Sequence, residues 1–80
     1  MKAIIENPVK LINENVQVEF IAILNAITES ETRMELSTRL TVIRGMIGIK
    51  EFAYGFGSSH MWVKQVVEYT PKQQVIFVEF

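Results

Sequence analysis

Histidine is the residue most used for acid–base catalysis near neutral pH, and this chain has one, His60. It follows Ser58 and Ser59, so the residue types of a Ser–His–acid set are present. Adjacent residues in a turn do not point at one another, however, and no Gly-x-Ser-x-Gly pattern surrounds either serine. If the protein is an enzyme, His60 is the candidate acid or base, with Glu51 or Glu68 as its partner. The sequence favours a protein that is not an enzyme.

The sequence does not indicate a metal or phosphate site either. Cysteine and aspartate are absent, and the nine acidic residues are glutamates scattered without a ligand spacing. Residues 55–59, Gly-Phe-Gly-Ser-Ser, could present backbone amides to an anion. They are not a P-loop, because no Lys-Ser or Lys-Thr pair follows and they lie inside a predicted hairpin. We therefore expect no metal and no cofactor, and we interpret this segment as a turn.

Aromatic residues gather around the predicted hairpin that contains His60. Aromatic side chains on a sheet, flanked by cations, stack single-stranded nucleic acids or nucleotides, and the same set can anchor a protein partner. The alternative is that the rings fill the core between the sheet and a helix, or between subunits. The candidate residues for binding a ligand or a partner are Tyr54, Phe56, His60, Trp62, Lys64 and Arg44.

Three strands are predicted in the C-terminal half of the chain, at residues 49–56, 60–69 and 74–80. Apolar residues recur at every second position in them, which is typical of strands. Residues 57–59 and 70–73 are short turns, so consecutive strands should pair antiparallel in a meander.

Residues 28–44 are predicted to form a helix. Thr28 and Glu31 have the spacing of a capping box, in which each side chain accepts a hydrogen bond from a free amide of the first turn. Leu36 and Leu40 belong to one apolar stripe at helical spacing. Threonines in the same stretch also suit a strand, and in that case the whole protein would be all-β, a meander or barrel.

Residues 16–27 are predicted to form a strand, because Val16, Val18 and Phe20 alternate with polar residues. A helix is the rival interpretation, since Val16, Phe20 and Ile23 also fit helical spacing. The β-branched content favours the strand. The chain before this segment is weakly marked, with a short strand at residues 2–6 and then a turn.

The predicted fold class is α+β, in one domain at residues 1–80. Its order is β-α-β-β-β, a small antiparallel sheet with one helix on one face. In architecture alone, this order resembles the first half of a ferredoxin-like sandwich.

Composition narrows the function classes. The formal net charge is -1, so no bulk positive field exists to hold nucleic acid by charge alone. Cysteine is absent, which excludes disulfides and thiolate chemistry. No apolar run approaches the ~20 residues of a membrane span, and the first residues are too short an apolar stretch for a signal peptide. We expect a cytoplasmic protein without a membrane partner.

Both faces of the predicted sheet carry large apolar residues. A helix of about 16 residues is ~24 Å long and covers one face at most. The second face should meet another body, and most soluble oligomers are symmetric homo-oligomers. A homo-oligomer, such as a dimer, is therefore the main expectation. The alternatives are that residues 1–12 fold back over this face, or that an external partner covers it. The unpaired edge of the last strand offers a second route, by sheet extension.

Three functions remain open. The first is a small non-catalytic interaction protein, of the kind frequent among phage accessory proteins, that binds a protein partner and acts as a homo-oligomer through the aromatic sheet face. The second is an oligomer that binds a small ligand or nucleotide, or a single-stranded nucleic acid, in a pocket between subunits. The third is a small enzyme without a cofactor that uses His60.

Overall fold

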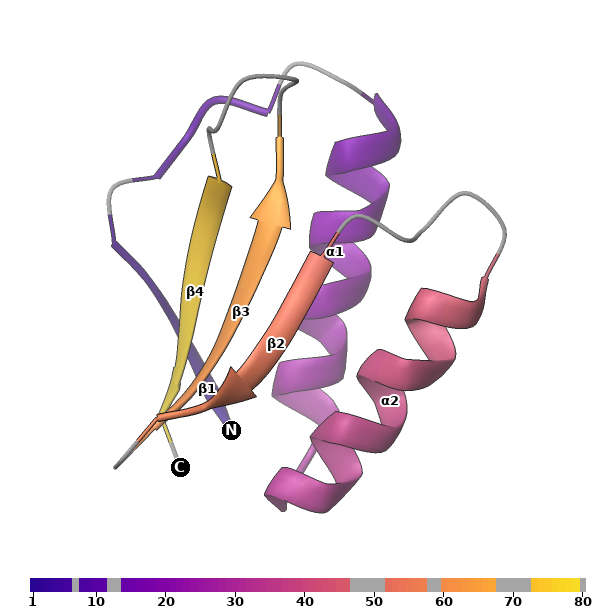
Figure 1. The fold of residues 1–80 in the computed structure, drawn as a ribbon, viewed down its shortest axis with the longest axis vertical. Coiled ribbons are helices and arrows are strands. Elements are labelled where there is room, and N and C mark those ends of the chain that lie inside the picture. Colours follow the sequence, from indigo (N-terminus) through magenta and orange to yellow (C-terminus); the bar gives the residue numbers. More distant parts are fainter. Residues whose placement is uncertain (7, 12–13, 47–51, 58–59, 68–72, 80) are drawn as a thin grey trace.

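The computed structural model describes residues 1–6, 8–11, 14–46, 52–57, 60–67 and 73–79. In chain order the elements are β1 (Lys2–Ile5), α1 (Glu14–Glu29), α2 (Arg33–Gly45), β2 (Phe52–Phe56), β3 (Met61–Val66) and β4 (Gln73–Glu79) (Figure 1). The α+β class is confirmed, with one more helix than predicted. Residues 47–51, 58–59, 68–72 and 80 lie outside the described residues. They include ends of the predicted strands and parts of the predicted turns.

The sheet has the order β1-β4-β3-β2, and every neighbouring pair is antiparallel. The predicted meander of β2, β3 and β4 is therefore confirmed. The last strand, however, is not an edge as we expected, because β1 pairs along its other side, with Ile4 opposite Phe77. The edges of the sheet are β1 and β2. The side of β4 at which we expected another chain to extend the sheet is thus occupied by β1.

The prediction of a strand at residues 16–27 is wrong, because these residues lie within α1. The helix buries Glu19, Ile23, Ala26 and Ile27, which follow one another at helical spacing. Several apolar residues fitted both periods, and β-branched content pointed to the strand. Intrinsic preference is a weak guide where burial decides, and here the stripe buried against the sheet is helical.

The second helix, α2, confirms the predicted helix but begins one turn later than expected. Thr28 lies inside α1, so its capping pattern with Glu31 is not used. The same pattern recurs four residues on. The Thr32 hydroxyl accepts a hydrogen bond from the Glu35 amide at 3.1 Å, and the Glu35 carboxylate accepts one from the Glu31 amide at 3.1 Å. Thr32 is therefore the N-cap that separates the two helices.

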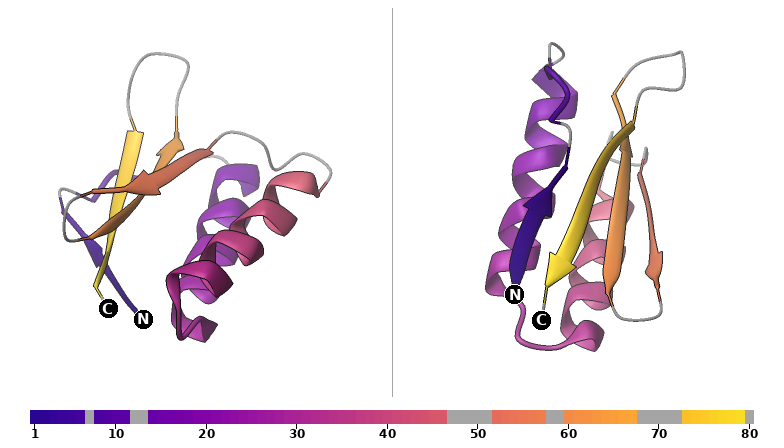
Figure 2. Two further views of the ribbon diagram at one scale, coloured as in Figure 1. Left: turned by 60° about the horizontal axis from the view of Figure 1, so that its bottom comes forward. Right: turned by 90° about the vertical axis from the view of Figure 1, so that its left-hand side faces the viewer.

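Both helices lie on the same side of the sheet, so the molecule has two layers (Figure 2). The core fills the space between the layers. Its buried residues are Ile23, Ala26, Ile27, Leu36, Leu40, Ile43, Phe52, Met61, Val63, Ile76 and Val78. Within the part of the chain that the structure describes, no helix has both the length and the apolar character that a bilayer crossing needs.

Candidate interaction surface

The sheet face opposite the helices, here called the open face, is the candidate site. Side chains alternate between the two faces of a strand, so the residues between the buried ones point to this side. The open face consists of Lys2, Ile4, Ala53, Gly55, His60, Trp62, Lys64, Val66, Gln73, Val75, Phe77 and Glu79. Among the described residues, no helix lies over it (Figure 2).

An apolar row crosses the middle of the open face. Phe77 on β4 is the register partner of both Ile4 on β1 and Trp62 on β3. Trp62 is in turn opposite Gly55 on β2. Val75 lies two residues from Phe77 on the same face. Ile4 is 37% exposed, and the side chains of Trp62, Val75 and Phe77 are half-buried. These residues therefore still present apolar area to solvent.

Two glycines of the hairpin make room for the rings of β3. A Cβ atom built on Gly55 would lie 2.6 Å from Cζ2 of Trp62, which no real side chain allows. A Cβ atom on Gly57 would lie 3.1 Å from the ring of His60. Each ring therefore lies over the backbone of the neighbouring strand. The sequence Gly-Phe-Gly belongs to the segment that we interpreted as a turn. Its two glycines let the rings of Trp62 and His60 lie close to the backbone on the open face.

Polar groups flank these rings. The His60 ring packs edge-on against Phe77, with 5.2 Å between ring centroids. The ammonium of Lys64 lies 4.9 Å from the centroid of the Trp62 ring, within the range of a cation–π contact. His60, Trp62 and Lys64, all predicted site residues, therefore do lie together, and they share the open face with Phe77.

Arg44 and Tyr54 lie on the other side of the sheet, between α2 and β2. The Arg44 guanidinium is 4.9 Å from the ring centroids of both Phe52 and Tyr54, and it donates a hydrogen bond to the Phe52 carbonyl at 2.7 Å. The hydroxyls of Thr41 and Tyr54 are 2.7 Å apart and share a hydrogen bond. These contacts join the end of α2 to β2, so here Arg44 and Tyr54 hold the two layers together.

Phe56, the sixth predicted site residue, is at the end of β2 on the helix side of the sheet. Its side chain is 55% exposed, and the Arg33 guanidinium lies 5.9 Å from its ring centroid. The aromatic cluster that the sequence suggested is thus divided between two faces. Sequence reasoning missed Phe77, whose place beside Trp62 depends on the register of β3 and β4, and it also missed Ile4 and Val75 on the same face.

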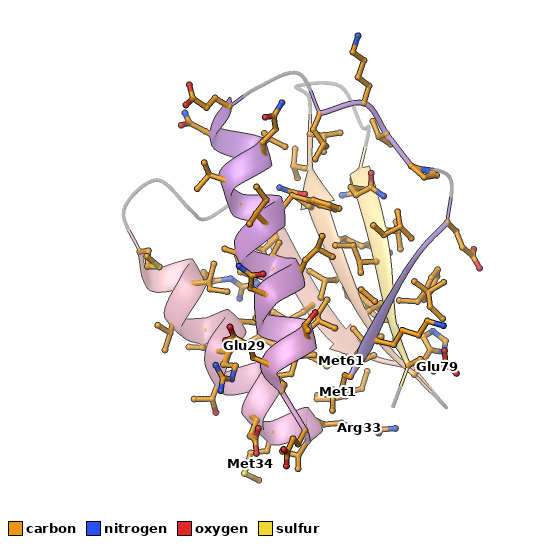
Figure 3. All side chains as sticks on the ribbon, turned by 180° about the vertical axis from the view of Figure 1, so that it is seen from behind. Met1, Glu29, Arg33, Met34, Met61 and Glu79 are labelled. Atoms are coloured by element: carbon orange, nitrogen blue, oxygen red, sulfur yellow. The ribbon has the colours of Figure 1, made fainter. Side chains whose placement is uncertain are left out.

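The charges of the open face lie on either side of the apolar row. Lys64 is two residues beyond Trp62 on β3, toward one end of the strands, whereas Glu79 is two residues beyond Phe77 on β4, toward the other end. Lys2 is beside Glu79 in the register of β1 and β4. Figure 3, drawn from the side of α1, shows Glu79 at the end of β4.

Residues 8–11 do not cover the open face. The Val9 amide donates a hydrogen bond at 2.8 Å to Oε1 of Gln74, whose buried side chain points to the helix side. Gln17 on α1 donates one from Nε2 to the Leu11 carbonyl at 2.6 Å. Residues 2–5 form β1. The described part of the N-terminal segment therefore leaves the open face uncovered.

The buried face of the sheet contains two glutamines side by side. Gln65 and Gln74 are register partners, 0% and 2% exposed. Gln65 donates from Nε2 to the Val16 carbonyl at 2.8 Å, which ties β3 to the first turn of α1. Oε1 of Gln65 and Nε2 of Gln74 have no hydrogen-bond partner among the described residues. Unsatisfied buried amide groups lower the stability of the folded state.

The outer side of the helices also exposes apolar side chains. Val18 and Ile21 on α1 are 53% and 57% exposed, and Val42 on α2 is 63% exposed. At the other end of this helix pair, Arg39 and Glu29 form an ion pair at 3.1 Å on the surface. Any test of the open face must therefore include a matched change on α1.

A family described as a domain of unknown function (DUF8466) matches residues 1–78. No curated protein and no solved structure matches the chain. The family assignment covers nearly the whole chain and carries no stated activity, so the geometry of the surface has to support the function.

Proposed function

The chain belongs to the DUF8466 family, and we propose that it is a small non-catalytic interaction protein that acts as a homodimer through its open face. The observation that carries this proposal is the row formed by Ile4, Phe77 and Trp62 on a sheet face over which no described helix lies. Aromatic residues with few charges at the centre and a charged rim are typical of interfaces.

The shape of the molecule supports a face-to-face contact. Its principal extents are 31 × 27 × 17 Å, so it is a plate with one thin dimension. A stable interface buries about 800 Å² of each partner. Two sheets that pack face to face lie about 10 Å apart with strands about 30° from parallel, and their inner side chains form a shared core. Such packing would give this small domain the second apolar layer that it lacks.

The charges at the two ends of the open face are compatible with a copy as the partner. A two-fold axis that lies in the interface and crosses the strands at the row of Trp62 and Phe77 exchanges the two strand ends. It brings Lys64 of one subunit toward Glu79 of the partner subunit. The rings at the centre then meet their own copies, and the opposite charges fall at the rim, where they favour one orientation.

The test is the mass in solution by light scattering, with Val75→Glu as the disrupting variant. Val75 is the register partner of Lys64, so the new carboxylate has a cation beside it in the isolated subunit and should not unfold it. In the dimer the same carboxylate would be buried in the interface. We expect the wild-type protein to have at least twice the subunit mass of 9.2 kDa. The variant should have half the wild-type mass, because the open-face contact is lost.

The matched control is Ile21→Glu, which makes the same change of charge on the exposed side of α1. It should leave the mass unchanged. A wild-type monomer at millimolar concentration would refute the proposal. Dissociation caused by Ile21→Glu but not by Val75→Glu would move the interface to the helices and would refute it as well.

A second function has an observation of its own. The Lys64 ammonium over the Trp62 ring, with His60 and Phe77 adjacent, combines a cation with flat rings, as sites for nucleotides do. Trp62 is the only tryptophan, so its fluorescence reports on this position alone. Titration with mononucleotides and short single strands should quench the emission if such ligands bind, and Lys64→Gln should weaken that quenching. A flat emission across the panel excludes this function.

A further inference from the structure

The strand β2 forms an edge of the sheet without the features that usually protect one. Its sequence, Phe-Ala-Tyr-Gly-Phe, contains no charged residue and no proline. The other edge, β1, is shorter, carries Lys2 and is followed closely by Pro8. Lysine, proline and short length are the usual means of preventing an edge from pairing with another chain. The edge at β2 is therefore the one that is open to another strand.

The hydrogen-bond pattern of the hairpin tells which groups of β2 point outward. The Gly57 amide donates to the His60 carbonyl at 2.7 Å, so these two residues form a hydrogen-bonded pair. Hydrogen-bonded and non-hydrogen-bonded pairs alternate along an antiparallel ladder. Gly55 is thus bonded to Trp62, and the next pair, Tyr54 and Val63, is of the other kind. The backbone groups of Tyr54, and likewise those of Phe56, point away from β3.

One contact of the structure agrees with this pattern. Phe52 has the same parity as Tyr54 and Phe56, so its carbonyl also points outward, and the Arg44 side chain donates to it at 2.7 Å. Arg44 therefore occupies the outward carbonyl of Phe52, the first residue of β2, so that this carbonyl is not available to another strand. Among the described residues, no donor or acceptor pairs with the outward amides and carbonyls of Tyr54 and Phe56, which leaves a short row of free backbone groups at the edge.

We propose that β2 pairs with β2 of a second copy, antiparallel about a two-fold axis at Gly55. Tyr54 then lies opposite Phe56 of the partner subunit, and Phe56 opposite Tyr54 of the partner subunit. Each of these pairs exchanges both of its N–H···O bonds, and Gly55 faces the partner's Gly55 between them. The pairing is self-complementary because the outward residues lie symmetrically around Gly55. It joins two sheets into one continuous sheet.

The side chains of β2 suit a copy as the partner. Phe56, which is 55% exposed in the single subunit, would pack beside Tyr54 of the partner subunit on the helix side of the sheet. On the open face, the one β2 side chain at the junction is the methyl group of Ala53, so the backbones can approach closely at Gly55. No like charges meet along the strand, because β2 has none. A copy therefore satisfies the free edge groups and covers an exposed ring with one contact.

This edge contact is independent of the open-face dimer and compatible with it. Its two-fold axis is perpendicular to the sheet, whereas the axis of the open-face contact lies parallel to the sheet. Both axes lie at the level where Gly55, Trp62 and Phe77 are register neighbours, so they intersect. Two perpendicular two-fold axes that intersect generate a closed tetramer rather than an open fibre. With both contacts, two extended sheets face each other and all helices lie outside. With the edge contact alone, the protein is a dimer.

The test uses two substitutions at one residue. Phe56→Pro removes an outward amide and keeps the bonds between β2 and β3, because Phe56 does not belong to a hydrogen-bonded pair of that hairpin. Phe56→Leu removes the ring and keeps the amide. We expect Phe56→Pro to halve the mass measured by light scattering and Phe56→Leu to leave it unchanged. Circular dichroism must show that both variants keep the wild-type fold.

Amide hydrogen exchange in the wild-type protein gives a second readout. The amides of Tyr54 and Phe56 should become protected as the concentration rises, whereas the amide of Gly55 should be protected at every concentration. Fast exchange of Tyr54 and Phe56 in the associated protein would overturn the edge proposal. A dimer that Phe56→Pro leaves intact and Val75→Glu dissociates would overturn it too, while supporting the open-face dimer. The opposite result would support the edge contact and refute the open-face dimer.

Discussion

The indole of Trp62 lies over the backbone of Gly55 on the neighbouring strand, where any side chain would collide with it. Gly55→Ala would place a Cβ atom 2.6 Å from Cζ2 of Trp62, so the ring has to move away from the sheet toward solvent. We expect a loss of about 1–3 kcal/mol in the free energy of unfolding. The tryptophan emission should also move to longer wavelength, and fluorescence with urea denaturation measures both effects.

Gly45→Ala is the matched control for that substitution. Gly45 is the last residue of α2, and a Cβ atom there meets no other atom within 4 Å. Alanine is favoured over glycine in a helix by about 0.5–1 kcal/mol. The control should therefore be neutral or stabilising and should leave the emission unchanged. Equal effects of the two alanines would show that the ring does not depend on the glycine.

Arg44 has a structural role in this fold, although its type and position suggested a binding residue. Arg44→Lys keeps the charge but loses the planar group that contacts two rings and reaches the Phe52 carbonyl. We expect a loss of about 1–2 kcal/mol in the free energy of unfolding, because a charged hydrogen bond and the stacking weaken together. The mass in solution should not change. If Arg44→Lys changed the mass in solution and not the free energy of unfolding, Arg44 would be a binding residue and not a structural one.

The strands were predictable and α1 was not, for one physical reason. In β3 and β4 the apolar residues alternate, so the strand is the interpretation that separates a buried face from an open one. In α1 the residues around Phe20 and Ile23 are apolar on both parities, so local pattern could not choose. The choice is made by packing against a sheet whose strands come later in the chain, and a single-sequence pattern does not contain that information.

Part of the candidate site could be predicted from the sequence. The parity of β3 was enough to place His60, Trp62 and Lys64 on one face. Separating them from Tyr54 and Phe56 also requires the register of the hairpin, in which Gly57 pairs with His60. Grouping by sequence proximity joined the two faces of the hairpin. The contact between Trp62 and Phe77 depends on the register across a connection of several residues, which residue types alone do not set.

The position of the N-cap distinguishes the sequence prediction from the structure in one experiment. Thr32→Ala removes the hydroxyl that accepts the Glu35 amide, and the loss of such a cap costs about 1 kcal/mol. Thr28→Ala changes an exposed residue inside α1, where alanine is the better helix former. Urea denaturation should therefore show a loss for the first variant and no loss for the second. The reverse order would mean that α2 begins at Thr28.

The two buried glutamines should respond to substitution with opposite signs. Gln65→Met removes Oε1, which has no hydrogen-bond partner among the described residues, and replaces an amide with an unbranched apolar chain of similar length. The Val16 carbonyl loses the bond from Nε2 but lies in a helix, where the amide four residues on also bonds it. We expect this variant to be neutral or more stable by about 1 kcal/mol. Gln74→Met instead leaves the Val9 amide without its acceptor and should cost about 1 kcal/mol. Urea denaturation of both variants, with an unchanged slope, gives the two values. A large loss for Gln65→Met would mean that its Oε1 is satisfied in solution, for example by a buried water.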